Sequence, residues 1–316
     1  KNIINKYKKK KLVFFISTKN EPSTIQIDYL KKQITESLKN KKNTYQSIVG
    51  IGGGSILDIT IALSLMINNS GKTEKYQGWD KIPKKGINSI GIPTISGTGA
   101  ETSRTCVLIN KKKNLKLGIN SNFSVFDQLI LDPNLTKTVP LNQYFYTAMD
   151  TYIHSFESLN GSFRNSIADS YNISALYLCE QIFQSQNIKS INNRSKLMTA
   201  SYMGGIALSS TLVGLVHPFS AGLSVVFGIH HCLANCIAMR GMKEFYPKEY
   251  KYFWQVVKKH KIEIPKITKN SLDRDNLNRL FLSTIIHKKP LENALGRRFK
   301  TILSKDKVFS IFKLMS

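Results

Sequence analysis

The chain has 316 residues and a formal net charge of +26, with 46 lysines and arginines against 20 acidic residues. Its length is typical of two domains of about 150 residues each. A hydrophobic content of 41% and a charged content of 21% exclude a disordered or collagen-like chain. Four cysteines are too few for a disulfide framework at this length, so we expect a reducing, cytoplasmic compartment. They are Cys106, Cys179, Cys232 and Cys236.

The excess positive charge allows two interpretations. Most basic residues are lysines, scattered or in short runs such as 8–11 and 111–113, whereas arginine, the preferred residue for phosphate and base recognition, is scarce. We therefore expect solvent-exposed lysines and no nucleic-acid partner. A basic nucleic-acid-binding protein is the alternative, although the sequence carries no RRM, KH, zinc-finger or helix-turn-helix signature.

The predicted elements of the first half alternate between strand and helix. Each apolar run that ends in a small-residue loop predicts a buried strand, and each following periodic segment predicts a helix. Lysines 111–113 with Asn114 predict the turn of a hairpin. Such alternation is typical of a mostly parallel α/β sheet. The expected strands are 12–16, 47–51, 90–93, 104–109, 115–119 and 129–131. The expected helices are 25–38 and one that follows the loop 52–55 and runs to about residue 66.

After about residue 140 helical periodicity dominates, and no strand is predicted. We therefore place a domain boundary near residue 138, with an α/β domain at 1–138 and an all-helical domain at 139–316. The expected helices are 144–159, 166–183, 194–212, 231–242, 250–260 and 272–286.

One stretch of the second half, between Lys196 and Arg240, contains no Asp, Glu, Lys or Arg. It is long enough to cross a membrane, which is one alternative. However, it holds His217, His231, Pro218 and many Ser and Gly residues. We therefore expect buried helices around a polar site and no membrane partner.

Two loops have the composition of a dinucleotide-binding site. Gly52-Gly53-Gly54-Ser55 joins a strand to a helix, where backbone N–H groups can approach a phosphate, and Asp58 lies in the first helical turn. The segment 93–101 follows the next parallel strand and is rich in Gly, Ser and Thr. Open α/β sheets bind ligands at this edge. A tight turn without a ligand is the alternative for either loop alone.

Histidine is scarce, and its spacing suggests a metal site. Asp150 and His154 are spaced i, i+4 and would share a helix face. His217 and His231 come from the charge-free stretch, where we expect Pro218 to break the helix between them, together with Gly222. Three imidazoles and one carboxylate suit Fe²⁺ or Zn²⁺. The alternative for any single histidine is a structural core residue.

Taken together, these motifs resemble the iron-containing (group III) alcohol dehydrogenase family, in order and spacing, from about residue 48 to 296. The resemblance implies a Rossmann-like α/β N-terminal domain with a parallel sheet, and an all-helical metal-binding C-terminal domain, in a dehydroquinate synthase-like architecture. Within the family the chain is most similar to members that oxidise the C8 alcohol of 3-deoxy-D-manno-octulosonate, a lipopolysaccharide sugar acid, before its amination. That similarity rests on residues 76–80, 95–101, 104–106, 125–133, 150–154 and 214–224.

The resemblance also implies residue roles. Metal ligands fall on Asp150, His154, His217 and His231. Cofactor contacts fall on Gly52, Gly53, Gly54, Ser55, Asp58, Thr94, Ser96, Thr98 and Lys116. An anionic sugar substrate needs a cation, for which Arg104, Arg164 and Lys116 are the candidates.

The chain departs from the family at two places. The family's proton-relay histidine is replaced by Ala221, so we expect His230 or water to carry the proton. The family's first strand and helix are expected to be missing, because the chain begins at Lys1.

The expected activity is metal-assisted oxidation of a primary alcohol, with Fe²⁺ or Zn²⁺ lowering the alcohol pKa and NAD(P) or O₂ accepting the hydride. A generic NAD(P)-dependent alcohol dehydrogenase for small alcohols is one alternative, and an inactive paralogue is another. The resemblance further implies a homodimer or larger assembly.

Overall fold

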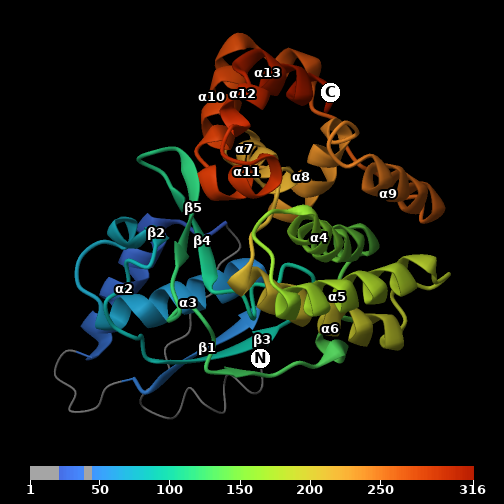
Figure 1. Cartoon of the computed structure of the whole chain (residues 1–316). Coiled ribbons are helices and arrows are strands. Elements are labelled where there is room, and N and C mark those ends of the chain that lie inside the picture. The colour runs from blue at the N-terminus through green and yellow to red at the C-terminus, as the bar shows by residue number, and fades with distance from the viewer. Residues whose placement is uncertain (1–20, 39–44) are drawn as a thin grey trace.

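The computed structural model describes residues 21–38 and 45–316, and the expected strand at 12–16 lies outside these residues. Figure 1 shows two parts: strands with α2 and α3 in one, and helices α4 to α13 in the other. The expected α/β and all-helical architecture is confirmed. Two separate hydrophobic clusters form the cores, one drawn from residues 27–126 and one from residues 144–315.

The first sheet is parallel and has the order β1-β3-β6. β1 (Ser47–Gly52) pairs along its whole length with β3 (Asn88–Pro93), so that Gly52 lies opposite Pro93. β6 is shorter than expected, at Gln128–Leu129. Because the strands are parallel, the two Gly-rich loops leave the sheet at the same edge.

The second sheet contains the expected hairpin. β4 (Thr105–Asn110) and β5 (Leu115–Asn120) are antiparallel, and Asn114 at the turn has a left-handed φ of 50°. The short β2 (Gly78–Trp79) pairs with the other side of β5. On the free side of β4, Ser23 forms a parallel bridge to Ile109, immediately before α2 (Thr24–Leu38). α3 (Gly54–Asn68) packs on both sheets and carries much of the first core.

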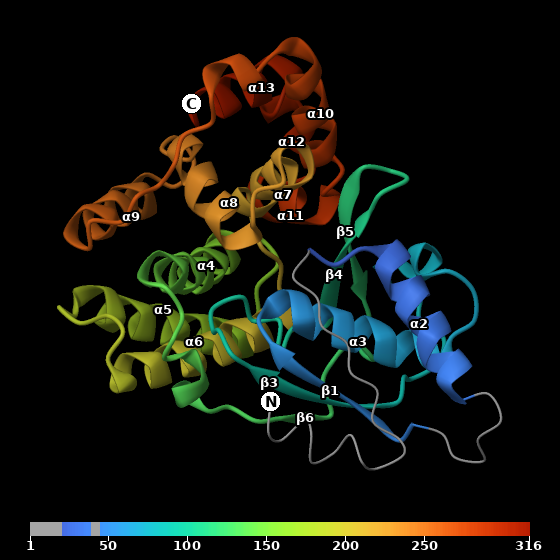
Figure 2. The ribbon, with the colours of Figure 1, turned by 180° about the vertical axis from the view of Figure 1, so that it is seen from behind.

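All of residues 141–316 are helix, turn or loop, as predicted. Figure 2 shows α4, α5 and α6 layered together, with α7 and α8 between them and the C-terminal helices. The bounds are α4 Leu141–Asn160, α5 Ser166–Gln184, α6 Ile191–Ser210, α7 Val216–Phe227, α8 His231–Ala238, α9 Pro247–Lys259, α10 Arg274–Ile285, α11 Lys288–Leu295, α12 Phe299–Ile302 and α13 Lys305–Lys313.

The expected helix break at Pro218 and Gly222 is wrong, because both residues lie inside α7. Pro218 is the third residue of α7, where its missing N–H has no partner within the helix in any case. The helix ends instead at Gly228, whose left-handed φ of 68° turns the chain before His230. His217 and His231 therefore lie near the N-termini of two successive helices.

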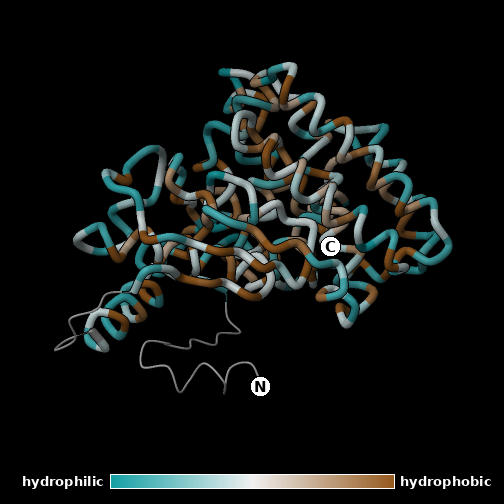
Figure 3. Tube along the Cα trace, turned by 90° about the horizontal axis from the view of Figure 1, so that it is seen from below, coloured by the Kyte–Doolittle hydropathy of each residue, from teal (hydrophilic) through white to brown (hydrophobic). Residues whose placement is uncertain are grey.

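The charge-free stretch folds into the end of α6, α7 and α8. In Figure 3 hydrophobic and hydrophilic positions are interspersed along the helices. Among the described residues, no helix is long and apolar enough to cross a membrane.

Candidate metal centre

α4 is the central element of the site. Its residues from Tyr144 to Ser158 are all buried, including Asp150 and His154, each 1% exposed. A carboxylate so deeply buried requires compensating partners, because an unpaired buried charge is costly. Asp150 finds them in α7 and α8.

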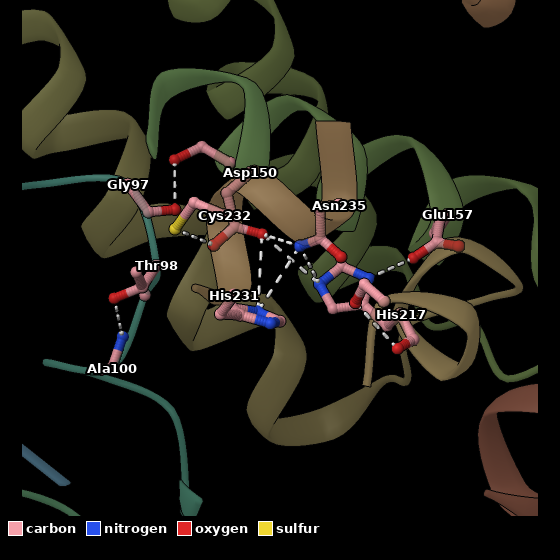
Figure 4. A network of polar contacts seen from close by, with 12 residues as sticks. Gly97, Thr98, Ala100, Asp150, Glu157, His217, His231, Cys232 and Asn235 are labelled. Carbon is pink, nitrogen blue, oxygen red and sulfur yellow. Dashed lines mark hydrogen bonds and ion pairs between the residues drawn. The ribbon is translucent and has the colours of Figure 1, made fainter. Parts of the chain in front are cut away.

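Three of the four expected ligands converge. One ligand atom each from Asp150, His217 and His231 lies within 4.8 Å of the other two. Nε2 of His217 is 3.5 Å and Nε2 of His231 is 3.8 Å from Oδ1 of Asp150 (Figure 4). A carboxylate with imidazole nitrogens is a donor set that Fe²⁺ and Zn²⁺ accept.

His154 is buried beside this cluster but is not part of it. Among the residues that the structure describes, neither of its ring nitrogens has a hydrogen-bond partner. The ring packs against α6, where a Cβ added to Gly204 would lie 2.3 Å from its Cε1. Two buried imidazole nitrogens without partners are what a missing metal bond leaves behind, so the donor set fits a divalent metal.

Glu157, which the sequence interpretation missed, orients His217. It is fully buried, and its Oε2 lies 2.5 Å from Nδ1 of His217. Its Oε1 accepts the backbone N–H of Val216, one of the unpaired donors at the start of α7. With one proton held on Nδ1, the proton that His217 gives up to a metal must come from Nε2, whose lone pair then faces Asp150 and His231. Since Asp150, His154 and Glu157 are spaced i, i+4, i+7, helical periodicity was the signal.

The pKa values separate His217, which is protonated at neutral pH, from His154 and His231, which are neutral. Burial lowers the pKa of His154 and of His231 to about 4, so both are neutral at neutral pH. Burial also disfavours the charge on His217, but Glu157 and Asp150 outweigh it and raise the pKa to about 9. Despite burial, the surrounding imidazoles hold the pKa of Asp150 well below its usual range. Asp150 is therefore ionised, as a metal ligand must be.

Asn235 and Cys232, both on α8, also contact Asp150 and were not expected. Nδ2 of Asn235 donates to Oδ1 of Asp150 at 2.6 Å and lies 3.3 Å from Nε2 of His217. The thiol of Cys232 lies 3.3 Å from Oδ2 of Asp150. Asn235 stands one helical turn after His231, so its position could have been inferred once that ligand was chosen.

The two Gly-rich loops lie side by side, as expected from the parallel strands. The N–H of Thr94 donates to the carbonyl of Gly52 at 2.9 Å. A Cβ on Gly53 would lie 2.7 Å from the Ile95 side chain, and one on Gly54 would lie 3.2 Å from Oγ1 of Thr98. Side chains at these two glycines would therefore fill the space between the loops. Ser55 follows in the first turn of α3, and the buried Ser96 hydroxyl has no hydrogen-bond partner within residues 21–38 and 45–316.

The second loop is fastened to the helical part by Ser201 of α6. Its hydroxyl accepts the N–H groups of Gly97 and Gly99 and donates to the buried Glu101 at 2.6 Å. Thr151 of α4 donates to the Gly97 carbonyl, one residue after Asp150. The loop expected to hold a cofactor is thus tied directly to the helix that carries the metal ligands.

Lys116 lies on β5, close to Asp58 and to the metal cluster. Burial raises the pKa of Asp58 to about 8, which the Lys116 charge opposes. Nζ of Lys116 is 3.0 Å from Oε2 of Glu21, whose Oε1 lies 3.2 Å from Nδ1 of His230. His230 is largely exposed, at 71% of its side chain.

The two arginines expected to bind substrate are held by other carboxylates. Arg104 pairs with the exposed Asp80. Arg164 lies beyond the C-terminal end of α4 and makes three hydrogen bonds to Asp169. From Asp150 to the end of α4 there are ten residues, about 15 Å of helix, so the structure does not bring Arg164 to the metal cluster.

Residues 1–133 match the family model described as iron-containing alcohol dehydrogenase, and residues 144–269 match that of the C-terminal domain of the same family. The chain belongs to the iron-containing alcohol dehydrogenase family. The family resemblance drawn from the motifs is thereby confirmed.

Three relatives illustrate the range of this family. Sulfoacetaldehyde reductase of Bilophila wadsworthia is 36% identical over 189 residues, 59% of this chain and 49% of the relative. NAD-dependent methanol dehydrogenase of Bacillus methanolicus is 28% identical over 63% of this chain and 53% of the relative. Alcohol dehydrogenase 4 of Schizosaccharomyces pombe is 27% identical over 65% and 49%. In these matches the chain spans about half the length of the relatives.

Two solved structures share the fold. Sulfoacetaldehyde reductase from Bifidobacterium kashiwanohense, crystallised in complex with NAD⁺, has a TM-score of 0.79 at 18% identity, over 99% of this chain and 88% of that one. A 1,3-propanediol oxidoreductase has a TM-score of 0.83 at 17% identity, over 96% and 84%. At these identities the likeness establishes the fold.

Proposed function

We propose that this protein is a metal-dependent oxidoreductase that interconverts a primary alcohol and an aldehyde, with a nicotinamide dinucleotide as hydride carrier. The observation that carries the proposal is the convergence of Asp150, His217 and His231 within 4.8 Å, on helices tied to the paired Gly-rich loops. The named relatives are dehydrogenases and reductases, which supports the same chemistry.

In this proposal Asp150, His154, His217 and His231 hold the metal. A bound Fe²⁺ or Zn²⁺ supplies Lewis acidity, which lowers the pKa of an alcohol. Glu157 keeps a proton of His217 on Nδ1, and burial in α4 excludes water from Asp150 and His154. His230, exposed at the edge of the cluster, remains the proposed proton carrier.

The cofactor is proposed to lie along the two loops. The N-terminus of α3 offers unpaired backbone N–H groups to a pyrophosphate. Its contacts are proposed to be Gly52, Gly53, Gly54, Ser55, Thr94, Ser96 and Thr98, with Asp58 and Lys116 nearby. The structure of a neighbour in complex with NAD⁺ supports this cofactor, and O₂ is the competing acceptor.

The substrate remains a proposal at two levels. The relatives act on alcohols and on sulfoacetaldehyde, which supports a small alcohol or aldehyde. The finer proposal is the C8 alcohol of 3-deoxy-D-manno-octulosonate, and it rests on the six sequence segments that resemble enzymes of that sugar. We also propose a domain division near residue 138. We further propose a homo-oligomeric assembly, whose mass sedimentation would measure.

The test is metal content and turnover on the same preparation. Purified protein is stripped, reloaded with Fe²⁺ or Zn²⁺, and assayed with NAD⁺ under nitrogen and under air on octulosonate, 2-hydroxyethanesulfonate and 1-propanol. D150N and H217A should lose metal and activity together, while H260Q, at a control histidine whose ring bonds the Phe183 carbonyl and packs against Phe145, should keep both. Metal retained at full stoichiometry in H217A would contradict the proposed site.

A further inference from the structure

Lys116 is the only Lys or Arg among the described residues whose side chain is buried, at 8% exposure. The chain has 46 basic residues, and the other basic residues that the structure describes are not buried. The burial of Lys116 therefore needs a specific structural cause. Its ammonium bonds to a single carboxylate, that of Glu21. An isolated buried ammonium would be strongly unfavourable, so some anion must always stand opposite Lys116.

The sheet register explains how Glu21 reaches this position. Lys116 on β5 lies opposite Ile109 on β4, and Ser23 bridges to the other side of Ile109. Three backbones therefore run side by side, about 5 Å apart, with Glu21 two residues before Ser23. Alternation along the strand places the Glu21 side chain on the face that Ser23 shares with Lys116.

A second hydrogen-bonding group approaches the same carboxylate from the helical part. Nδ1 of His230 lies 3.2 Å from Oε1 of Glu21, while Lys116 takes Oε2 at 3.0 Å. His230 directly precedes the metal ligand His231, and β5 packs against α7, which carries His217. The carboxylate of Glu21 thus lies between the Lys116 ammonium and the His230 imidazole beside the metal cluster.

We propose that Lys116 and His230 form a subsite for the carboxylate or sulfonate of the substrate, and that Glu21 occupies this subsite until the substrate anion replaces it. The inference rests on the coarser level of the proposed function and names its substrate class: a small hydroxy or oxo acid whose anionic group lies close to the reacting carbon, unlike the C8 alcohol of octulosonate, which is remote from the carboxylate. Exchange of one carboxylate for another anion keeps Lys116 paired throughout.

The other cations are less suited to this role. Arg164 lies beyond α4 with Asp169, and Arg104 pairs with Asp80, whose side chain is 64% exposed. Neither pair involves a neighbour of a metal ligand. In the described chain Glu21 makes no side-chain hydrogen bond other than those to Lys116 and His230, so nothing else retains it when an anion competes.

The experiment compares two substrates that differ in charge. 2-Hydroxyethanesulfonate carries the anion, and 2-(methylsulfonyl)ethanol is its neutral counterpart of similar size. Loss of a hydrogen bond to a charged group costs about ten- to a hundredfold in binding. K116Q should therefore raise KM for the sulfonate about tenfold or more relative to the sulfone, and E21Q should lower it relative to the sulfone. K112Q, on the same hairpin and paired with Glu74, is the matched control.

Two further measurements keep the outcomes separate. The double variant E21Q with K116Q leaves no unpaired charge, so it tests the subsite if K116Q alone fails to fold. Methanesulfonate binding, followed by thermal shift on the metal-loaded protein, tests the subsite even where no alcohol is turned over, which would sink the proposed function alone. An equal rise in KM for both substrates, accompanied by a higher KM for NAD⁺, would assign Lys116 to the cofactor and overturn the proposal.

Discussion

Replacing Glu157 by glutamine tests a residue that orients the proposed metal ligand His217 without binding the metal itself. The variant keeps the side-chain volume but removes one acceptor and the negative charge. In the native protein one oxygen accepts from Val216 and the other faces Nδ1 of His217. If the glutamine oxygen stays on Val216, its NH₂ group faces Nδ1, which must then become an acceptor. The His217 proton moves to Nε2, where it blocks the ligand lone pair.

The expected magnitude follows from this single change of tautomer. Loss of a group that orients a metal-bound histidine typically weakens metal binding by about 10- to 100-fold. That range corresponds to about 1.4–2.7 kcal/mol, which matches the 1.5–3 kcal/mol expected for a charge-assisted hydrogen bond. Because Glu157 is fully buried, solvent does not replace the lost acceptor.

Chelator competition measures the change directly. We expect E157Q to bind Zn²⁺ about 10- to 100-fold more weakly than the native protein, with nearly unchanged secondary structure. E244Q is the control, because Glu244 also pairs with a cation but is 63% exposed and far from α4 in sequence. Zn²⁺ binding by E157Q within twofold of the native value would refute the assigned role of Glu157.

Three other outcomes are expected. Metal binding should release about one proton at neutral pH, because His217 has a pKa of about 9 in the metal-free protein, and calorimetry in two buffers should show the release fading above that pH. G204A, whose Cβ would meet the His154 ring at 2.3 Å, should cost about 1–3 kcal/mol in denaturant unfolding and lower the metal content. Asp58 keeps its proton up to about pH 8 when folded but loses it near pH 4 when unfolded. The folded state therefore binds the extra proton, and stability should fall by about 1.4 kcal/mol per pH unit between these values, a slope that D58N should remove.

The sequence was sufficient for the parts of the fold whose pattern is long and regular. α4, α5 and β1 lie within a few residues of their predicted bounds, because 15 or more periodic residues or an apolar run define them. α12 and α13 were missed, since four and nine residues give too few turns for a periodic signal. α7 differs from the prediction for another reason: the sequence pattern predicts a helix break at Pro218, whereas a proline in the first turn of a helix loses no hydrogen bond.

The site was predictable to the extent that it is local. Asp150 and His154 follow from helical spacing, and Glu157 continues the same face, so it could have been included. His217 and His231 were chosen because histidine is rare in a charge-free stretch. Glu21 could not be found in this way, because it lies 209 residues from His230 and meets it only through the tertiary fold.

The buried charges restrict which residues can stand beside the metal cluster. An unpaired buried ion costs several kcal/mol, so each charge beside the cluster requires a partner. His217, protonated at neutral pH, lies between Glu157 and Asp150, and Lys116 lies against Glu21. Burial raises the pKa of Asp58 to about 8 in spite of the nearby Lys116 charge, so Asp58 is neutral at neutral pH. A dication that binds Asp150 and His217 must therefore displace a proton from His217. The Lys116 ammonium is not affected by that exchange, and its partner is Glu21 or an incoming anion.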